Sequence, residues 1–372
     1  MEYKKLSECA DFRNERTKQI DFETYISTEN MLPNKAGVST AESLPDVKTT
    51  TKYLPKDILL SNIRPYFKKI WFSNREGGCS NDVLVVTAKQ GVNPNYLYYV
   101  LSDNNFFNYD TITSKGTKMP RGTPKAIMKY LVPDVDKDYQ DKIVFILSRY
   151  DSLIENNNKR IKALEQMAEN LYKEWFVRFR FPGYENAEFE NGIPKDWDVL
   201  KVSDIALIKA GGDRPVVFSD IITEKCSIPV YSNGLEKEGL YGYTDKAIIH
   251  DESITISARG TVGFVCYRRT PFVPIVRLIA IVPNIEIVTP LYMFYYFKND
   301  SIIANGTSQQ QITIPMVSRK KVLLPSKKIL QEFGNLEKPL WDCIDKLKEK
   351  NKNLIKQRDL LLPRLMSGKL EV

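Results

Sequence analysis

The chain has 372 residues, of which 42% are hydrophobic and 11% aromatic, and this composition is typical of a folded protein rather than a disordered one. Its net charge of +8 favours a polyanionic partner, because Lys and Arg side chains that neutralise phosphates release counterions. No stretch approaches the roughly 18 apolar residues of a membrane span, and the charged start offers no apolar signal core, so we expect a soluble, cytoplasmic protein without membrane contact.

Cysteine and histidine are scarce in this chain. The five cysteines are scattered and never spaced as CxxC, which argues against a disulfide framework and against a zinc knuckle. The single histidine, His250, argues against a His-based metal site, and a Ser/His/Asp or Cys/His catalytic set is possible only through this residue, which we interpret as a loop or surface residue. No P-loop and no nuclease-like cluster of acids is present. We therefore expect no catalytic, metal-binding or cofactor-binding residue.

Residues 1–135 are predicted to form a first globular domain with a mixed α/β (α+β) fold. Runs of β-branched residues at 58–60 and 83–86 predict strands separated by turns, and the aromatic run at 96–101 predicts a short helix. The Asn-Pro-Asn-Tyr motif at 93–96 resembles the Asn-Pro-Pro-Tyr motif of amino-methyltransferases. Its third residue differs and no glycine-rich cofactor loop accompanies it, so we interpret it as the start of that helix.

Basic and amide side chains gather with aromatic residues at two places in this domain. Lys and Arg pair with guanine edges and phosphates, whereas Asn and Gln pair with adenine. DNA contacts are therefore predicted at Asn62, Arg64, Tyr66, Lys68 and Lys69, and at Lys115, Lys118, Arg121 and Lys125. For any single member, the alternative is a solvated basic surface.

Residues 136–182 are predicted to form a long helix. Apolar residues alternate at spacings of four and three, which is the heptad seam by which a helix packs on a partner helix. The seam consists of Ile143, Leu147, Tyr150, Ile154, Asn157, Ile161, Leu164, Leu171 and Trp175. Two interpretations of Asn157 stay open: a buried amide that fixes register, or an exposed residue in a frayed turn.

Residues 183–325 are predicted to form a second globular domain of the same mixed class, and residues 326–372 a second long helix. Strand-like runs lie at 254–256, 262–267 and 278–282. DNA contacts are predicted at Arg259, Arg268, Arg269 and Arg277, and at Ser308, Gln309, Gln310 and Gln311. The second helix has its own seam, with Ile344, Leu347, Leu354 and Leu361. Glycine pairs at 77–78 and 211–212 are interpreted as turns.

The chain also aligns with itself at an offset of about 190 to 196 residues. Four segments match in the same order: 6–10 with 202–206, 94–99 with 290–295, 116–117 with 306–307, and 131–133 with 323–325. This match predicts a tandem duplication in which each copy is a globular domain followed by a long helix. Two matching seams pack most simply on each other. An antiparallel pair relates the copies by a pseudo-twofold axis.

With these residues in hand, the chain resembles the specificity (S) subunit of type I restriction-modification enzymes. The stretch at 153–183 resembles the central conserved region of that family, and Ile193, Pro194 and Trp197 resemble the opening of a second target recognition domain. Residues 306–311 resemble a segment common in such domains, and residues 361–368 resemble the distal ending of the family.

The resemblance implies a division of labour among subunits. Each target recognition domain reads one half of a split double-stranded DNA site, and two conserved antiparallel helices set the gap between the halves. The S subunit is not catalytic. Two methyltransferase (M) subunits that use S-adenosylmethionine and two ATP-driven, Mg-dependent restriction (R) subunits complete the enzyme. One departure is that Pro339 and Pro363 lie in the second helix, so we expect kinks near its ends.

Two other functions remain as alternatives: a catalytically competent nuclease or methyltransferase fusion, and a coiled-coil scaffold that binds only protein. The first copy is Lys-rich around Arg121 and the second is Gln-rich at 309–311. This difference predicts two unlike half-sites and therefore an asymmetric DNA target.

Overall fold

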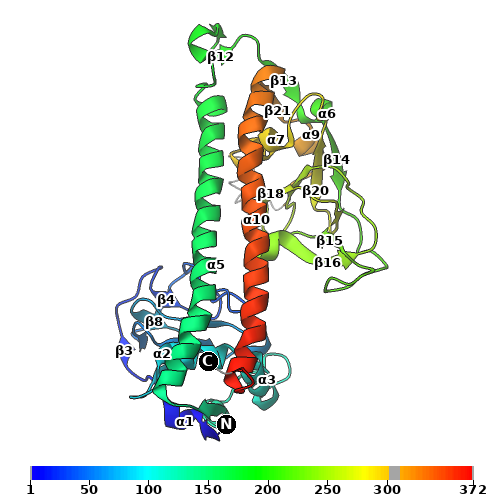
Figure 1. The fold of residues 1–372 in the computed structure, drawn as a ribbon. Helices are drawn as coiled ribbons and strands as arrows, with labels where there is room; N and C mark the ends of the chain where they lie inside the picture. The colour runs from blue at the N-terminus through cyan, green and yellow to red at the C-terminus, as the bar shows by residue number, and fades with distance from the viewer. Residues whose placement is uncertain (1, 301–310, 371–372) are drawn as a thin grey trace. The chain divides into compact units, whose positions relative to one another are not determined.

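The computed structural model describes residues 2–300 and 311–370 and divides the chain into two compact units. Unit 1 comprises residues 1–158 and 348–372, and unit 2 comprises residues 159–347. Each unit contains one globular domain of mixed helix and sheet together with a stretch of both long helices (Figure 1). The division agrees with a duplicated chain.

Unit 1 begins with short strands and small helices. Its elements are β1 (Glu2–Lys5), α1 (Leu6–Cys9), β2 (Ala10–Phe12), β3 (Arg16–Thr17), β4 (Tyr25–Ile26), β5 (Thr50–Tyr53), β6 (Ile58–Ser61), the 3-10 helix η1 (Pro65–Phe67), β7 (Ile70–Phe72), β8 (Gly77–Cys79), β9 (Val83–Ala88), α2 (Pro94–Ser102), α3 (Asn104–Thr113), α4 (Pro124–Ile127) and β10 (Leu131–Asp134). The expected strands at 58–60 and 83–86 and the expected helix at 96–101 are therefore present.

Two four-stranded sheets and one two-stranded sheet build unit 1. The antiparallel sheet β2-β9-β6-β7 carries the central strand β6, whose four residues are all buried. The second sheet, β3-β5-β8-β4, has one parallel pair, β4 with β8. Strand β1 pairs with β10, with Lys5 opposite Leu131. The chain therefore enters and leaves the domain side by side.

The glycine pair at 77–78 lies in strand β8 and not in a turn, which corrects the interpretation from the sequence. A Cβ atom on Gly77 would approach the carbonyl oxygen of Thr24 to 2.3 Å, and one on Gly78 would approach Oγ1 of Thr50 to 2.1 Å. These glycines are required by close packing of neighbouring chain segments.

Unit 2 repeats this arrangement with additional short elements. After the helices it contains η3 (Tyr184–Asn186), β11 (Phe189–Glu190), β12 (Ile193–Pro194), β13 (Asp198–Lys201), α6 (Val202–Ile205), β14 (Ala206–Ala210), β15 (Ile228–Tyr231), η4 (Glu236–Gly239), β16 (Leu240–Thr244), β17 (Ser253–Ile256), β18 (Val265–Arg268), β19 (Val273–Pro274), β20 (Ile279–Pro283), α7 (Pro290–Lys298), α9 (Ile314–Ser318) and β21 (Lys321–Leu324). Its main sheet has the order β14-β20-β17-β18, and β13 pairs with β21.

Matching strand pairs reveal the true register of the repeat. Lys5 pairs with Leu131 in unit 1, and Lys201 pairs with Lys321 in unit 2. Leu131 is therefore equivalent to Lys321, and Val132 is equivalent to Val322. The two valines are fully buried. The sequence match of 131–133 with 323–325 was shifted by two residues, because both segments place two apolar residues before a proline.

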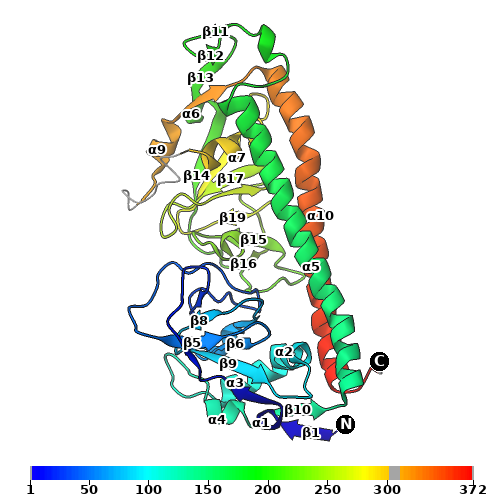
Figure 2. The ribbon, with the colours of Figure 1, turned by 90° about the vertical axis from the view of Figure 1, so that its left-hand side faces the viewer.

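Two long helices, α5 (Lys137–Tyr172) and α10 (Lys327–Met366), carry the predicted seams. Within unit 1, Ile143 and Leu147 share a core with Leu362 and Leu365; within unit 2, Leu164 packs in the core that contains Ile344. The two helices therefore run antiparallel in each unit, side by side in both views (Figures 1 and 2). All predicted seam residues are buried or half-buried. Helix α10 continues through Pro339 and Pro363 without a break.

Asn157 occupies the seam as a buried amide, which decides between its two interpretations. Its side chain is 4% exposed, and its Nδ2 donates to Oδ1 of Asn351 at 2.8 Å. Asn351 in turn donates to Oδ1 of Asn158, also at 2.8 Å. A polar pair at one level of an apolar seam fixes the register of the two helices, because a shift would leave these amides unpaired.

Helix α5 ends earlier than the sequence predicted. A π-helical turn (Lys173–Val177) follows Tyr172, and Trp175 packs from it against Phe333 of α10, with ring centroids 5.9 Å apart. The ring of Phe181 then packs against the ring of Trp197 in a tilted arrangement, with centroids 5.2 Å apart. The aromatic residues that close the first copy therefore belong to the core of unit 2.

Candidate nucleic-acid interface

A strained turn after strand β6 forms the first part of the candidate interface in unit 1. Arg64 (φ 50°) and Lys68 (φ 53°) adopt left-handed backbone conformations on either side of the 3-10 turn Pro65–Phe67. Such conformations are costly for residues other than glycine and are concentrated at functional sites. The turn leaves Tyr66 (47%) and Phe67 (39%) exposed.

Two cationic side chains lie near the exposed ring of Phe67. The guanidinium of Arg64 lies 6.0 Å from the ring centroid, and Nζ of Lys69 lies 5.9 Å from it. Lys69 also donates to the carbonyl oxygen of Thr28 at 2.6 Å, and Lys68 donates to Oδ1 of Asn104 at 2.7 Å. Sequence reasoning chose Tyr66 and missed Phe67, although both are aromatic residues in the same basic turn.

The second predicted segment of this domain joins the first through the backbone. The amide of Arg64 donates to the carbonyl of Pro120 at 2.8 Å, and the amide of Gly122 donates to the carbonyl of Asn62 at 3.0 Å. Lys115 and Arg121 exchange two backbone hydrogen bonds of 2.9 Å. Arg121 and its backbone partner Lys115 are therefore linked to the Arg64 turn. The predicted contacts of this segment are all exposed, namely Lys115, Lys118, Arg121 and Lys125.

Asn62 supports this surface from below. Its Oδ1 is buried and without a hydrogen-bond partner, as are both carboxyl oxygens of Asp110. A Cβ atom on Gly122 would approach Asp110 Oδ1 to 2.6 Å and Asn62 Oδ1 to 2.8 Å. Burial raises the pKa of Asp110 to about 6, since the charged form loses its hydration. The buried Oδ1 of half-buried Asn62 is therefore not available to accept a hydrogen bond from a base, and a DNA contact through its Nδ2 group stays a prediction.

The candidate interface of unit 2 comprises residues from three loops. The side chain of Arg259, which is exposed, donates from Nη2 to Oε1 of Gln311 at 3.0 Å. Asn233 connects the Arg259 loop to the Arg277 loop: its Oδ1 accepts from the amide of Ala258 at 2.8 Å, and its Nδ2 donates to the carbonyl of Val276 at 2.6 Å. Arg259, Arg277 and Gln311 are thus held on neighbouring loops.

The backbone of Gly211 and Gly212 holds the Arg277 loop in place. The amide of Arg277 donates to the carbonyl of Gly211 at 3.0 Å, and the amide of Val276 donates to the carbonyl of Gly212 at 2.8 Å. A Cβ atom on Gly211 would approach the backbone nitrogen of Ile275 to 2.7 Å. Gly211 therefore serves close packing against the 275–277 loop, whereas a Cβ atom on Gly212 would meet open space.

Arg268 is a structural residue and is withdrawn as a DNA contact. Its side chain is 4% exposed. Nε donates to Thr255 Oγ1 at 2.9 Å, Nη2 donates to the carbonyl of Glu238 at 2.6 Å, and the guanidinium lies 3.7 Å from the ring centroid of Tyr231. Because it is buried and fully engaged, it has no donor to present to a base.

Arg269 is likewise engaged inside the unit. Its guanidinium pairs with Asp342 and Asp345 of helix α10, each at 2.5 Å, and its pKa is raised by these carboxylates despite an opposing effect of burial. We therefore assign Arg269 to the attachment of the domain to its helix. The predicted contacts Ser308, Gln309 and Gln310 lie outside the residues that the structure describes.

Comparison with known proteins identifies the family. The family model for the type I restriction modification DNA specificity domain matches residues 2–166 and again residues 194–359. The chain belongs to this family. The double match also agrees with the duplication that the strand pairing shows.

Several curated specificity subunits are similar to this one. It is 27% identical over 314 residues to the type I restriction enzyme MjaIX specificity subunit of Methanocaldococcus jannaschii, an alignment that covers 77% of this chain and 71% of the relative. It is 23% identical over 462 aligned positions to the HindI specificity subunit of Haemophilus influenzae, covering 97% and 98%. The crystal structure of the S subunit of a type I system from M. genitalium shares the fold, with a TM-score of 0.55 at 15% identity over 98% of this chain and 96% of that one.

The Asn-Pro-Asn-Tyr motif of this specificity subunit is a helix start. Asn93 caps helix α2, and its Oδ1 accepts from the amides of Asn95 at 2.9 Å and Tyr96 at 3.4 Å. Thr289 caps helix α7 at the equivalent place. Tyr96 is buried, and its hydroxyl donates to the carbonyl of Pro133 at 3.1 Å. The motif therefore has a structural explanation.

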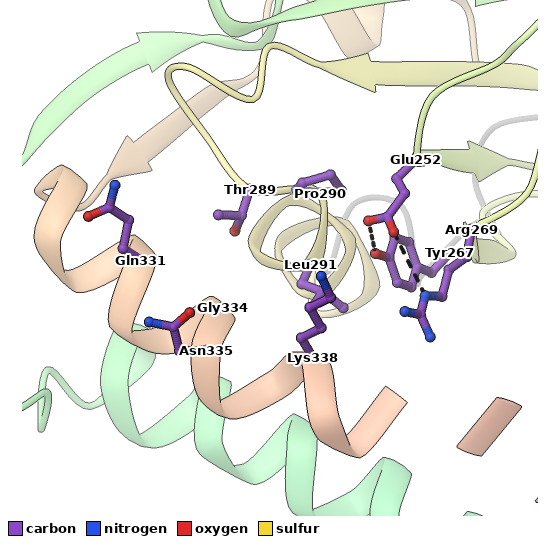
Figure 3. Close-up of a pocket in the computed structure, with 10 residues that line it drawn as sticks. All are labelled: Glu252, Tyr267, Arg269, Thr289, Pro290, Leu291, Gln331, Gly334, Asn335 and Lys338. Atoms are coloured by element: carbon purple, nitrogen blue, oxygen red, sulfur yellow. Dashed lines mark hydrogen bonds and ion pairs between the residues drawn. The ribbon is translucent and has the colours of Figure 1, made fainter. Parts of the chain in front are cut away.

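A cavity of about 460 Å³ lies within unit 2 at the start of helix α7, facing helix α10 (Figure 3). Glu252, Tyr267 and Arg269 form one wall, where the Tyr267 hydroxyl donates to Glu252 and Arg269 lies 3.9 Å from the same carboxylate (Figure 3). Lys338 stands on the helix side. The charged groups of the wall thus neutralise one another.

No set of three or more His, Cys, Asp or Glu side chains within residues 2–300 and 311–370 is placed to hold a metal ion. In the same part of the chain, no helix combines the length and the apolar character that crossing a bilayer demands. All five cysteines have free thiols, and Cys79 is so deeply buried that its pKa is raised to about 12.

Proposed function

We propose that this specificity subunit recognises a bipartite, asymmetric double-stranded DNA site, with one half-site for each domain. The observation that carries the proposal is the duplicated domain, in which equivalent loops carry different side chains. The first copy presents exposed Lys and Arg around Arg121, and the second presents Arg259 and Arg277 with Gln311. These are the side chains that read base edges and phosphates in duplex DNA.

We further propose that the chain acts as a non-catalytic scaffold for two M and two R subunits. S-adenosylmethionine, ATP and Mg would then be bound by those partners. The proposal is supported by the names of the relatives, which are specificity subunits of restriction enzymes. Since its DNA partner lies there, we expect the complex in the cytoplasm.

Exposed apolar side chains on helix α5 suggest where an M subunit docks. Phe145 (60%) and Leu153 (46%) are separated by eight residues, which places them on one helix face, and the guanidinium of Arg149 lies between them, 4.6 Å from the Phe145 ring centroid. An exposed aromatic stacked by Arg is a typical interface anchor. Phe145→Ala is expected to weaken M binding at least tenfold in a titration. Lys162→Ala, which removes an exposed side chain from a different face of the same helix, is the matched control.

The experiment that tests DNA recognition is a selection. Chain and M subunits are purified together and used to recover bound duplexes from a random-sequence library, which is then sequenced. The proposal predicts two different short motifs at a fixed spacing. Recovery of no gapped consensus would contradict it.

Assays on the purified chain, with and without its M subunits, distinguish this proposal from a protein-only scaffold and from a fused enzyme. A protein-only scaffold would show no salt-dependent DNA affinity even with its partners present. A fused enzyme would methylate or cleave DNA without any M or R subunit. We expect neither result.

A further inference from the structure

Arg121 and Gln311 occupy equivalent positions in the two domains. In unit 1 the amide of Gly122 donates to the carbonyl of Asn62 at 3.0 Å; in unit 2 the amide of Ile312 donates to the carbonyl of Ala258 at 3.1 Å. Each acceptor lies four residues beyond a fully buried isoleucine of the central strand, Ile58 in β6 and Ile254 in β17.

The helix that follows provides an independent anchor. Thr123 is the N-cap residue of α4 and Thr313 is the N-cap residue of α9, two positions after Arg121 and Gln311 respectively. Four residues beyond each cap, Ile127 and Val317 are buried in the core. The same backbone scaffold therefore presents an arginine in one domain and a glutamine in the other.

In unit 1, a neighbouring carboxylate orients the arginine. Arg121 is 53% exposed at its side chain, and its Nη1 donates to Oδ1 of Asp82 at 2.8 Å. Among the described residues, none accepts from Nε or Nη2 of Arg121. A guanidinium held at one end keeps the pair of parallel donors that matches N7 and O6 of guanine.

In unit 2, a neighbouring cation orients the glutamine. Arg259 donates to Gln311, and because a guanidinium has no acceptor, the contacted atom is the amide oxygen. That oxygen retains a second lone pair, and the Nε2 group supplies the donor, which together match N6 and N7 of adenine. Leu84 pairs with Leu60 of β6, and Ile279 pairs with Ile256 of β17, so Leu84 and Ile279 are equivalent. Two residues before them, Asp82 in unit 1 is equivalent to Arg277 in unit 2. An acidic residue at this position in unit 1 is thus replaced by a basic one in unit 2, where the partner that contacts Gln311 is Arg259 from another loop.

We propose that Arg121 and Gln311 are the matched base-reading residues of the two half-sites, with Arg121 selecting guanine and Gln311 selecting adenine. This inference rests on the proposed function, since it assumes that each domain reads duplex DNA. It assigns one defined position in each half-site to one named side chain.

Reciprocal substitutions in the complex with M subunits test this assignment, with the library selection as readout. Arg121→Gln is expected to change one position of one half-site from guanine to adenine, with a preference shift of about tenfold to a hundredfold and all other positions unchanged. Gln311→Arg is expected to make the opposite change in the other half-site. Arg121→Lys keeps the charge and loses the parallel donors, so it should lower discrimination at the same position.

Lys129→Gln is the matched control, because it removes an exposed charge outside the loops and should leave the consensus unchanged. Thermal melting of each variant checks that the fold is retained. If Arg121→Gln weakens all sequences equally and reduces the salt dependence, Arg121 contacts phosphate and the assignment is overturned. A gapped consensus in the unsubstituted complex still upholds the proposed function in that case, whereas its absence would count against the proposed function itself.

Discussion

The two domains share their strand pairing and the positions of their helix caps, and they differ in the side chains that their loops expose. Central strands, helix caps and the strand pair that closes each domain match residue for residue, as Lys5 with Leu131 and Lys201 with Lys321 illustrate. The loops after the central strands do not match: an aromatic, cation-rich turn with left-handed Arg64 stands in one copy, and a loop tied by Asn233 stands in the other. The strand pairing and the positions of the helix caps are thus alike in the two copies, while the side chains that these loops expose differ.

The helices show a related difference where they meet the domains. In unit 1 the Tyr99 hydroxyl donates to Asp151 at 2.6 Å, and Arg358 donates to the other oxygen of that carboxylate at 2.7 Å. At the equivalent place in unit 2, the Trp341 indole donates to the hydroxyl of Tyr295 at 3.1 Å. An ion pair in one copy is thus replaced by an aromatic contact in the other.

The largest expected effect comes from the aromatic core of unit 2. Phe333 is fully buried and contacts the rings of Tyr172, Trp175, Phe176 and Tyr295. Phe333→Ala should lower the free energy of unfolding by about 3–5 kcal/mol, because it leaves a cavity. Urea denaturation followed by tryptophan fluorescence measures this. The matched variant is Ile143→Ala at the equivalent position of α5, and an equal or larger loss there would contradict the proposed difference.

The second prediction concerns Glu337, which is fully buried where the first copy has Leu147. Burial raises its pKa from 4.5 to about 8, and the neighbouring Tyr295 and Trp341 side chains offset only part of this. The folded state therefore holds the proton more tightly than the unfolded state. Its contribution to stability is full below about pH 4.5 and is lost as the pH rises to about 8.

Glu337→Leu should remove this pH dependence and stabilise the protein at pH 8 by an amount on the order of a few kcal/mol. Urea denaturation at several pH values between 5 and 8 is the measurement. A variant as pH-dependent as the original chain would show that Glu337 is not the titrating group.

A smaller effect is expected at the amide pair of the seam. Asn157→Ala leaves the Asn351 amide oxygen without its donor and should cost about 1–3 kcal/mol. Replacing both residues with Leu should restore most of this loss, since no unpaired polar group remains. If the free energy of unfolding of Asn157→Ala were within about 0.5 kcal/mol of that of the original chain, the amide pair would not be part of the packed seam.

The smallest effect on stability distinguishes two arginines of unit 2. Arg277→Ala removes an exposed side chain and should change the free energy of unfolding by less than about 0.5 kcal/mol, while lowering DNA affinity in the complex. Arg268→Ala, the matched variant, removes a buried guanidinium and should cost about 1–3 kcal/mol. If the two variants were equally stable, the structural role of Arg268 would be ruled out.

The features that depend on periodicity and on repetition could be predicted from the sequence. The seam of α5 and the duplication follow from spacing alone. Backbone hydrogen bonds link the Arg64 and Arg121 segments, and their role as DNA contacts stays a prediction. The burial of Arg268 could also have been predicted from the sequence. It lies two residues after Cys266 in a strand, so alternation places both side chains on the inner face. The tight packing around Gly77 and Gly211 could not be predicted, because it depends on segments distant in the sequence.

A domain graft tests most directly whether the two domains share an equivalent fold and recognise different half-sites. Residues 6–130 replace residues 202–320, so that both junctions fall at strand pairs with matching register, Lys5 with Leu131 and Lys201 with Lys321. The complex of this chain with M subunits is then used to select from the random-sequence library. The account predicts a consensus that is an inverted repeat of the first half-site. Selection of the original asymmetric consensus would contradict it.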